Sequence, residues 1–125
     1  MKKRILLVED DPSTIDVVLL ELEFLGYEVM VAKNGVEALE MASTELPDLI
    51  VMDIRIPKMN GLQVASEIRN NLKTHAIPIL AATVKAMPGD REKCLASGCD
   101  GYIAKPFTHK ELGAAVEKLL SYTLA

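Results

Sequence analysis

Aromatic residues and clustered positive charge are both scarce in this 125-residue sequence. It has no tryptophan, and aromatic residues make up only 4% of it, although half of its residues are hydrophobic. A core can therefore form, but it must be mainly aliphatic. The formal net charge is −4 and the sequence pI is about 5.2. Because binding to nucleic acids and to anionic membranes relies on clustered Lys and Arg, this balance argues against both kinds of partner.

Cysteine and long apolar segments are also scarce. Cys94 and Cys99 are the only cysteines, and without a Cys/His cluster around them they cannot supply the four ligands of a structural zinc site. We expect both to be free thiols. After a basic start, the first apolar run covers only residues 5–8 before three acids, whereas a signal peptide needs about 7–15 apolar residues. We therefore expect a cytoplasmic protein without a transmembrane span, forming one domain over residues 1–125.

Short apolar runs alternate along the chain with longer segments of helical spacing. Ile15, Val18 and Leu22, for example, follow the i, i+3, i+7 rule of an amphipathic helix. The pattern predicts strands over residues 4–8, 27–32, 48–52, 77–82 and 101–104, and helices over 12–25, 35–45, 61–72, about 88–97 and 109–121. Five such strand–helix units predict an α/β fold, with a parallel sheet covered by helices on both faces.

Capping residues support these helix boundaries. Asp11 precedes Pro12, which is acceptable in a first helical turn, and Thr108 with Glu111 matches a capping box. Asn34 is a further expected N-cap, and Gly26 and Gly98 are expected to end helices, Gly26 in the left-handed conformation.

Side chains that could bind a ligand or take part in a reaction follow the carboxyl ends of four predicted strands. Glu9 and Asp10 follow the first strand, Asp53 follows the third, Thr83 the fourth and Lys105 the fifth. Ligands of open parallel sheets bind outside this edge. Three carboxylates close together repel one another unless a cation neutralises them, and oxygen ligands without His or Cys suit Mg²⁺.

Together these groups predict a site that accepts a phosphoryl group. Asp53 would be the nucleophile and would form an acyl phosphate, while the metal and Lys105 would stabilise the charge on the phosphoryl oxygens. Thr83 would donate a hydrogen bond to the same anion. Each residue alone has an ordinary explanation as a cap, a solvated side chain or packing, so the prediction depends on the combination.

The motifs resemble those of response-regulator receiver domains of the CheY-like superfamily over nearly the whole chain. They are LVEDD at residues 7–11, DLIVMD at 48–53 with Pro57 and Gly61 after it, AT at 82–83, and YIAKPF at 102–107. The order and spacing of the motifs also match. The resemblance implies a doubly wound, flavodoxin-like (βα)5 fold whose five parallel strands have the order 2-1-3-4-5.

The resemblance also implies roles for individual residues. It makes Asp53 the phosphoacceptor, and it makes Glu9, Asp10, Asp53 and the backbone carbonyl of Arg55 the Mg²⁺ ligands. Thr83 and Lys105 would bind the phosphoryl oxygens, and the peptide bond before Pro106 would be cis. Tyr102 would be the switch residue that moves inward when the threonine shifts. The alternative for Tyr102 is a half-buried aromatic side chain that never moves.

A receiver of this kind works in two-component signal transduction. Its phosphoryl group would come from a histidine kinase or a histidine phosphotransfer protein, and phosphorylation would change the partner surface around the last two helices and the strand between them. It would not be an enzyme beyond its own phosphoryl transfer and autodephosphorylation. The sequence does not identify the output partner, and it leaves open whether phosphorylation produces a dimer. Because no output domain is predicted, the chain is either a stand-alone receiver or part of a larger protein.

Three other functional classes fit less well. A pseudo-receiver, acting as an interaction module without phosphorylation, normally loses one of the key residues, and none is lost here. An aspartyl-nucleophile phosphatase would carry a DxD-type motif after the first strand, and a flavin binder would carry a phosphate-binding loop there. His75 and His109 form no recognisable triad and are expected at the surface. Val84 is larger than the residue usual in the family, and the basic Arg55 and Lys85 are expected to flank the pocket.

Overall fold

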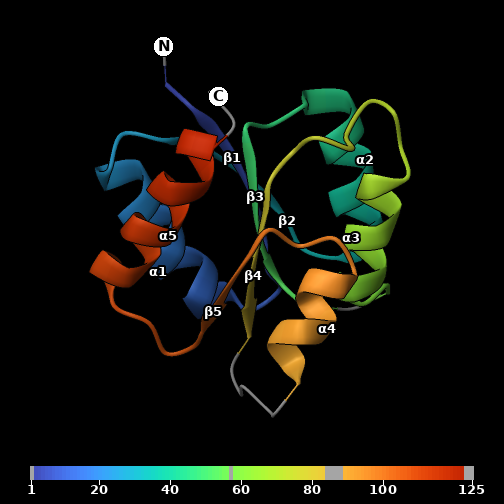
Figure 1. Ribbon diagram of the computed structural model, residues 1–125. Coiled ribbons are helices and arrows are strands. Elements are labelled where there is room, and N and C mark those ends of the chain that lie inside the picture. The colour runs from blue at the N-terminus through green and yellow to red at the C-terminus, as the bar shows by residue number, and fades with distance from the viewer. Residues whose placement is uncertain (1, 57, 84–88, 123–125) are drawn as a thin grey trace.

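The computed structural model describes residues 2–56, 58–83 and 89–122 and contains one parallel sheet (Figure 1). The strands are β1 (Arg4–Val8), β2 (Glu28–Ala32), β3 (Leu49–Asp53), β4 (Ile79–Thr83) and β5 (Gly101–Ala104). Their order in the sheet is β2-β1-β3-β4-β5, and every neighbouring pair is parallel. This confirms the predicted fold class and strand order.

Helices cover both faces of the sheet. They are α1 (Pro12–Phe24), α2 (Gly35–Glu45), α3 (Gly61–Arg69), α4 (Asp90–Ala96) and α5 (His109–Tyr122). Figure 1 shows α1 and α5 on one face and α2, α3 and α4 on the other. No helix in the described part of the chain combines the length and the apolar character needed to cross a membrane.

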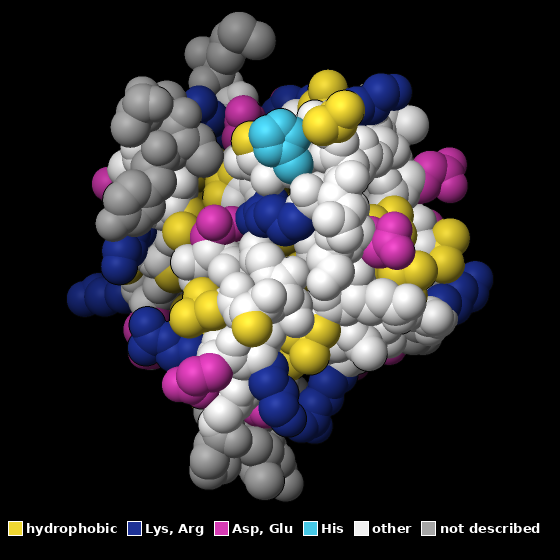
Figure 2. Space-filling view, turned by 45° about the vertical axis from the view of Figure 1, so that its right-hand side comes forward, with side chains coloured by type: hydrophobic (Ala, Val, Ile, Leu, Met, Phe, Trp, Pro, Cys, Tyr) yellow, Lys and Arg dark blue, Asp and Glu magenta, His cyan; other side chains and the backbone are white. Residues whose placement is uncertain are grey.

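Each face of the sheet has its own aliphatic core. Successive side chains of β1 point to opposite faces of the sheet. Leu6 and Val8 pack under α2 and α3, whereas Ile5 and Leu7 pack under α1 and α5. The largest fully buried side chains are all Ile, Leu, Val or Met. On the face seen in Figure 2, hydrophobic side chains form small groups among charged side chains of both signs.

The predicted helix caps are confirmed. The Asp11 carboxylate accepts a hydrogen bond from Thr14 N at 2.9 Å. Thr108 and Glu111 bond each other reciprocally, with Thr108 N donating to Glu111 Oε1 at 2.8 Å and Glu111 N to Thr108 Oγ1 at 3.1 Å. Asn34 caps α2, and Gly26 and Gly98 have φ values of +96° and +115° at the ends of α1 and α4.

Several element boundaries differ from the prediction. The helix predicted over 61–72 ends at Arg69, and Leu72 lies in the following turns with 90% of its surface exposed. β4 begins at Ile79 rather than at 77, since Pro78 has no N–H to donate to the sheet. Asp53 and Thr83 are the last residues of their strands instead of following them. The helix predicted over about 88–97 covers Asp90–Ala96.

Polar groups at the amino end of the strands are paired. The Arg69 guanidinium binds the Asp100 carboxylate and also donates to Ile77 O at 2.6 Å. The same Asp100 oxygen accepts from Ile79 N, at the start of β4, at 2.9 Å. These bonds tie the end of α3 to the starts of β4 and β5.

Candidate functional site

The three predicted acids converge at the carboxyl end of the sheet. β1 and β3 are neighbours, with Val8 opposite Met52, so the residues after β1 lie beside the last residue of β3. One carboxylate oxygen each from Glu9, Asp10 and Asp53 lies within 4.8 Å of the others. Glu9 and Asp53 are 3% and 8% exposed, while Asp10 is exposed. Two of the three acids are therefore sheltered, and the third faces solvent.

Lys105 supplies a cation to this cluster from the far side of β4. Its Nζ donates to Glu9 Oε1 at 2.5 Å and to Asp53 Oδ2 at 3.3 Å. Burial by itself lowers the pKa of Lys105, but the hydrogen bond to Glu9 and the charges of Asp53 and Glu9 outweigh that effect. The pKa of Lys105 is therefore raised, which keeps the ammonium charged between the two carboxylates.

Backbone amides hold the two sheltered carboxylates in place. Glu9 Oε2 accepts from the N–H groups of Asp10 and Asp11 at 3.1 and 3.2 Å. Asp53 Oδ1 accepts from Arg55 N at 2.9 Å, which leaves Oδ2 for Lys105. Both oxygens of each carboxylate are engaged, and this fixes their orientation at the sheet edge.

The donor set fits a hard divalent cation. It consists of carboxylate oxygens alone, and oxygen ligands suit Mg²⁺, which takes one or two carboxylates and keeps several waters. Asp10 is the most accessible of the three acids, and no hydrogen bond to its carboxylate is found within the described residues. The residues can therefore hold such an ion, with Asp10 the least committed ligand.

Thr83 lies at the same edge, at the end of β4. Its residue is fully buried, and its hydroxyl has no hydrogen-bond partner among the described residues. Most buried polar groups are satisfied, and leaving one unsatisfied costs about 1–3 kcal/mol. A donor held in this way next to carboxylates is suited to an anion that binds at this edge.

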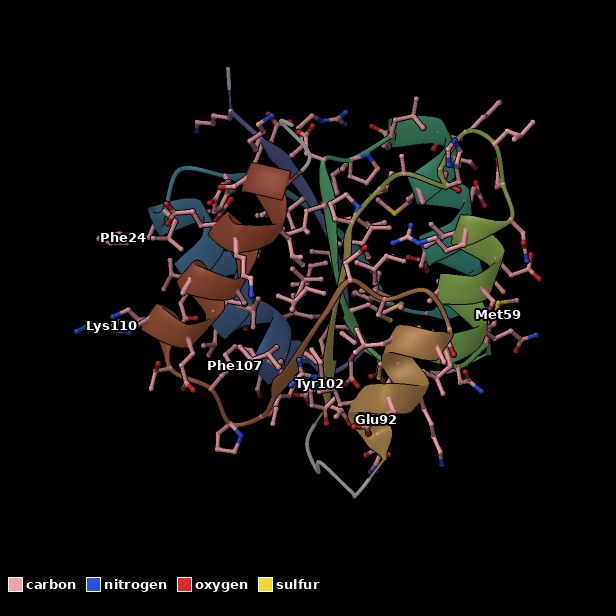
Figure 3. The ribbon with its side chains drawn as sticks, in the orientation of Figure 1. Phe24, Met59, Glu92, Tyr102, Phe107 and Lys110 are labelled. Carbon is pink, nitrogen blue, oxygen red and sulfur yellow. The ribbon has the colours of Figure 1, made fainter. Side chains whose placement is uncertain are left out.

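Tyr102, on β5, packs beside α4 (Figure 3). The residue is half-buried, its ring packs against the core that contains Cys94, and its hydroxyl is also buried without a partner among the described atoms. Burial, followed by the charges of Asp90 and Cys94, raises the pKa of the Tyr102 phenol. This placement agrees with both the switch role and its immobile alternative, so the role stays a prediction.

Two glycines hold the loop that orients Asp53. A Cβ at Gly35 would lie 2.5 Å from Met59 O, and a Cβ at Gly61 would lie 2.5 Å from Ile54 Cα. Gly61 N also donates to Ile54 O at 2.8 Å. The contact of Gly35 with this loop escaped the sequence analysis. The only signal for it was a glycine directly after the N-cap of α2.

The remaining predicted residues fall into two groups. The peptide bond between Lys105 and Pro106 is cis, Cys94 and Cys99 are buried free thiols, and His75 and His109 are exposed, as predicted. The Arg55 side chain is exposed, and its carbonyl stays a predicted metal ligand. Pro57, Val84 and Lys85 lie outside the described residues.

Comparison with known proteins gives a consistent result. The family model described as response regulator receiver domain matches residues 5–117. The chain is 40% identical over 120 residues to the alkaline phosphatase synthesis transcriptional regulatory protein PhoP of Bacillus subtilis, covering 96% of this chain and 49% of PhoP. It therefore spans about half the length of that relative. It is 38% identical over 108 residues to the polar-differentiation response regulator DivK of Brucella anthropi, covering 86% of this chain and 88% of DivK.

Solved structures show the same fold. The receiver domain of sensor histidine kinase PA1611 from Pseudomonas aeruginosa, which has a magnesium ion coordinated in its active site cleft, matches with a TM-score of 0.90 and 37% identity, covering 97% of this chain and 99% of that one. The chemotaxis response regulator CheY4 of Vibrio cholerae matches with a TM-score of 0.89 and 29% identity, covering 95% and 99% of the two chains.

Proposed function

The chain belongs to the response regulator receiver domain family of two-component signal transduction, and we propose that it accepts a phosphoryl group on Asp53 with Mg²⁺ bound beside it. A receiver domain is a phosphoacceptor rather than an enzyme that turns over a separate substrate. The observation that carries the proposal is the Lys105 ammonium, which lies between Glu9 and Asp53 within a cluster of three carboxylates. We propose one such domain over residues 1–125.

The proposed transfer forms one bond and breaks one. A carboxylate oxygen of Asp53 attacks the phosphorus, and the bond from phosphorus to the donor's imidazole nitrogen breaks, leaving its electron pair on that nitrogen. Lys105 and Thr83 donate hydrogen bonds to the phosphoryl oxygens. Glu9, Asp10, Asp53 and the Arg55 carbonyl would hold Mg²⁺, which would supply positive charge to neutralise part of the negative charge. Attack of water on the same phosphorus later releases phosphate and restores the Asp53 carboxylate.

The proposed switch starts from the unsatisfied hydroxyl of Thr83. A phosphoryl group on Asp53 brings three strong acceptor oxygens and added negative charge to the end of β3. Thr83 would move to donate a hydrogen bond to one of these oxygens. Tyr102 would fill the space that Thr83 vacates, and the surface of α4, β5 and α5 would repack. This is a shift between two populated states, driven by the better fit of the phosphorylated site to one of them.

The proposed partners follow from this chemistry. The donor would be a histidine kinase or a histidine phosphotransfer protein in the cytoplasm, and an output protein would read the α4–β5–α5 surface. A dimer that forms on phosphorylation is a further candidate. The pseudo-receiver alternative is not favoured, because the acids, the threonine and the lysine are all retained.

Incubation with acetyl phosphate and MgCl₂, followed by intact-mass measurement, tests the proposal. We expect the wild-type chain to gain the mass of one phosphoryl group, and Asp53→Asn or addition of EDTA to abolish the gain. Asp11→Asn is the matched control, because Asp11 adjoins the cluster but its carboxylate caps α1, a role that Asn also fills. A wild-type chain that gains no mass, or an Asp53→Asn chain that gains it, would refute the proposal.

A further inference from the structure

The two cysteines of the chain form a pair where α4 ends. Cys94 is the only buried residue of α4, and Cys99 lies between α4 and β5, also buried. Both belong to the core on the face of the sheet that α2, α3 and α4 cover. The two thiols form a hydrogen bond with each other. The proposed phosphoryl chemistry uses neither thiol, so the pair needs an explanation of its own.

A helix-ending motif of the backbone brings the two cysteines together. Gly98, with a φ of +115°, turns the chain back over the last turn of α4. Cys99 N then donates to Cys94 O at 3.0 Å, and Gly98 N donates to Leu95 O at 3.2 Å. These are the two hydrogen bonds of a Schellman motif, in which the side chains at the positions of Cys94 and Cys99 contact each other. That contact is usually hydrophobic, and here both of its members are thiols.

The pair joins a lightly held helix to a firmly held strand. α4 has seven residues, starts without a side-chain cap, and buries only Cys94. In contrast, Asp100, which follows Cys99, binds the Arg69 guanidinium, and its N–H donates to Ile79 O at 2.8 Å. A covalent bond between the two thiols would therefore fix the end of α4 to the anchored start of β5.

Burial controls how readily the thiols can react. It raises the pKa of Cys94, and it raises that of Cys99 to about 12. Because the thiolate is the reactive form, neither cysteine reacts readily while α4 is packed in place. A short helix without a side-chain cap is an element in which local opening is expected, and opening at its end exposes both thiols together. Reaction is therefore coupled to the opening of α4.

We propose that Cys94 and Cys99 are a redox modification site, at which a low-molecular-weight disulfide such as oxidised glutathione converts the two thiols into one internal disulfide. Cys99 is 5% exposed and Cys94 fully buried, so the Cys99 thiolate attacks the oxidant first and releases one thiol. The Cys94 thiolate then attacks the Cys99 sulfur of the mixed disulfide and releases the second thiol. The two released thiols carry away the two electrons and two protons that the cysteines lose. Nothing in this step depends on the chemistry of Asp53.

Equilibration of the full chain with mixtures of oxidised and reduced glutathione tests the proposal. Trypsin cuts after Lys93 and Lys110 but not before Pro106, so one peptide, residues 94–110, carries both cysteines. An internal disulfide lowers the mass of this peptide by two hydrogens. We expect the equilibrium constant for the disulfide to be at least about tenfold larger in the folded chain than in concentrated urea, because the fold already holds the thiols together.

Amide exchange gives a second readout. Oxidation should slow exchange at residues 97–99, whose N–H groups bond to the end of α4, about tenfold and leave α2 unchanged. Cys94→Ala and Cys99→Ala are the matched controls, and neither should change its exchange when oxidised glutathione is added. An equilibrium constant no larger in the folded chain than in urea would overturn the proposal. So would mixed disulfides without the internal bond, or a disulfide-linked dimer on a non-reducing gel.

Discussion

The two ends of the sheet use polar side chains in opposite ways. At the amino end, the Arg69–Asp100 pair and its bonds to Ile77 and Ile79 leave these charges and amides partnered. At the carboxyl end, three carboxylates share one lysine, and the Thr83 hydroxyl has no partner among the described residues. Both ends belong to the same five strands, so the difference in pairing lies in the residues at the strand ends and not in a difference between strands.

The two ends of the sheet therefore contribute differently to the stability of the fold. Paired polar groups at the amino end stabilise the folded state, whereas crowded acids and an unsatisfied donor at the carboxyl end oppose it. Local departures of this kind are expected at functional sites. Substitutions at matched positions of the two ends should therefore change the free energy of unfolding with opposite signs.

The largest effect is expected from removing an acid at each end. Asp100→Ala should lower the free energy of unfolding by about 2 kcal/mol, because Arg69 loses its carboxylate and Ile79 N its acceptor. Asp10→Ala, measured without divalent ions, should cause no loss, because it relieves repulsion in the acid cluster. Urea unfolding followed by circular dichroism gives both values. A clear loss in Asp10→Ala would contradict the comparison.

Two buried threonines give a sharper test at about 1 kcal/mol. Thr83 and Thr74 are 0% and 2% exposed, but among the described residues only the Thr74 hydroxyl has a partner, donating to Ile68 O at 2.8 Å. Thr83→Val should raise the free energy of unfolding by about 1 kcal/mol, and Thr74→Val should lower it by a similar amount. Equal effects from the two substitutions in urea titrations would show that the Thr83 hydroxyl is satisfied in solution.

Backbone strain, by contrast, is expected to be similar at the two ends. Lys58, in the loop after β3, and Leu46, at the end of α2, have φ values of 70° and 47°, in the left-handed region. Lys58→Gly and Leu46→Gly should each raise the free energy of unfolding by about 0.5 kcal/mol, because the relief of strain outweighs the entropy cost of glycine. Thermal unfolding would show this gain as a higher melting temperature, and destabilisation by either substitution would contradict the expectation.

The smallest effect is a pH dependence that belongs to Lys105. Because the folded-state pKa of Lys105 is raised, its contribution is complete below the unfolded value of about 10.4 and is lost as pH rises through the folded-state pKa. In EDTA, wild type should therefore lose more stability than Lys105→Met between pH 10 and 12, by less than about 1 kcal/mol. Lys118→Met, at an exposed position, should follow wild type. Parallel curves for all three proteins would refute the assignment.

Local signals in the sequence were enough for most of the fold. Apolar periodicity and caps such as Asp11 and Thr108 act within a few residues, so they could be recognised without tertiary information. The end of α3 was wrong because Leu72 continues the helical spacing yet faces solvent. The start of β4 was wrong because the apolar run includes Pro78. In both cases the apolar pattern in the sequence continued beyond the helix or strand that the structure forms.

The candidate site was predictable as a group of residues but not as a geometry. The strand-end rule brought Glu9, Asp53 and Lys105 to one edge. Lys105 lies closer to Glu9 than to Asp53, and Thr83 has no partner among the described residues, because of how side chains at the ends of four strands pack. No pattern along the chain carries that information.

The two glycines that hold the loop after Asp53 set a limit on how this protein can vary. Neither Gly35 nor Gly61 carries a functional group, yet any side chain at either position would collide with loop backbone, at Met59 O or Ile54 Cα. Such a collision would shift the segment that supplies the Arg55 N–H to Asp53. In a saturation library, positions 35 and 61 should therefore tolerate as few substitutions as Asp53, the proposed phosphoacceptor, for reasons of space rather than chemistry.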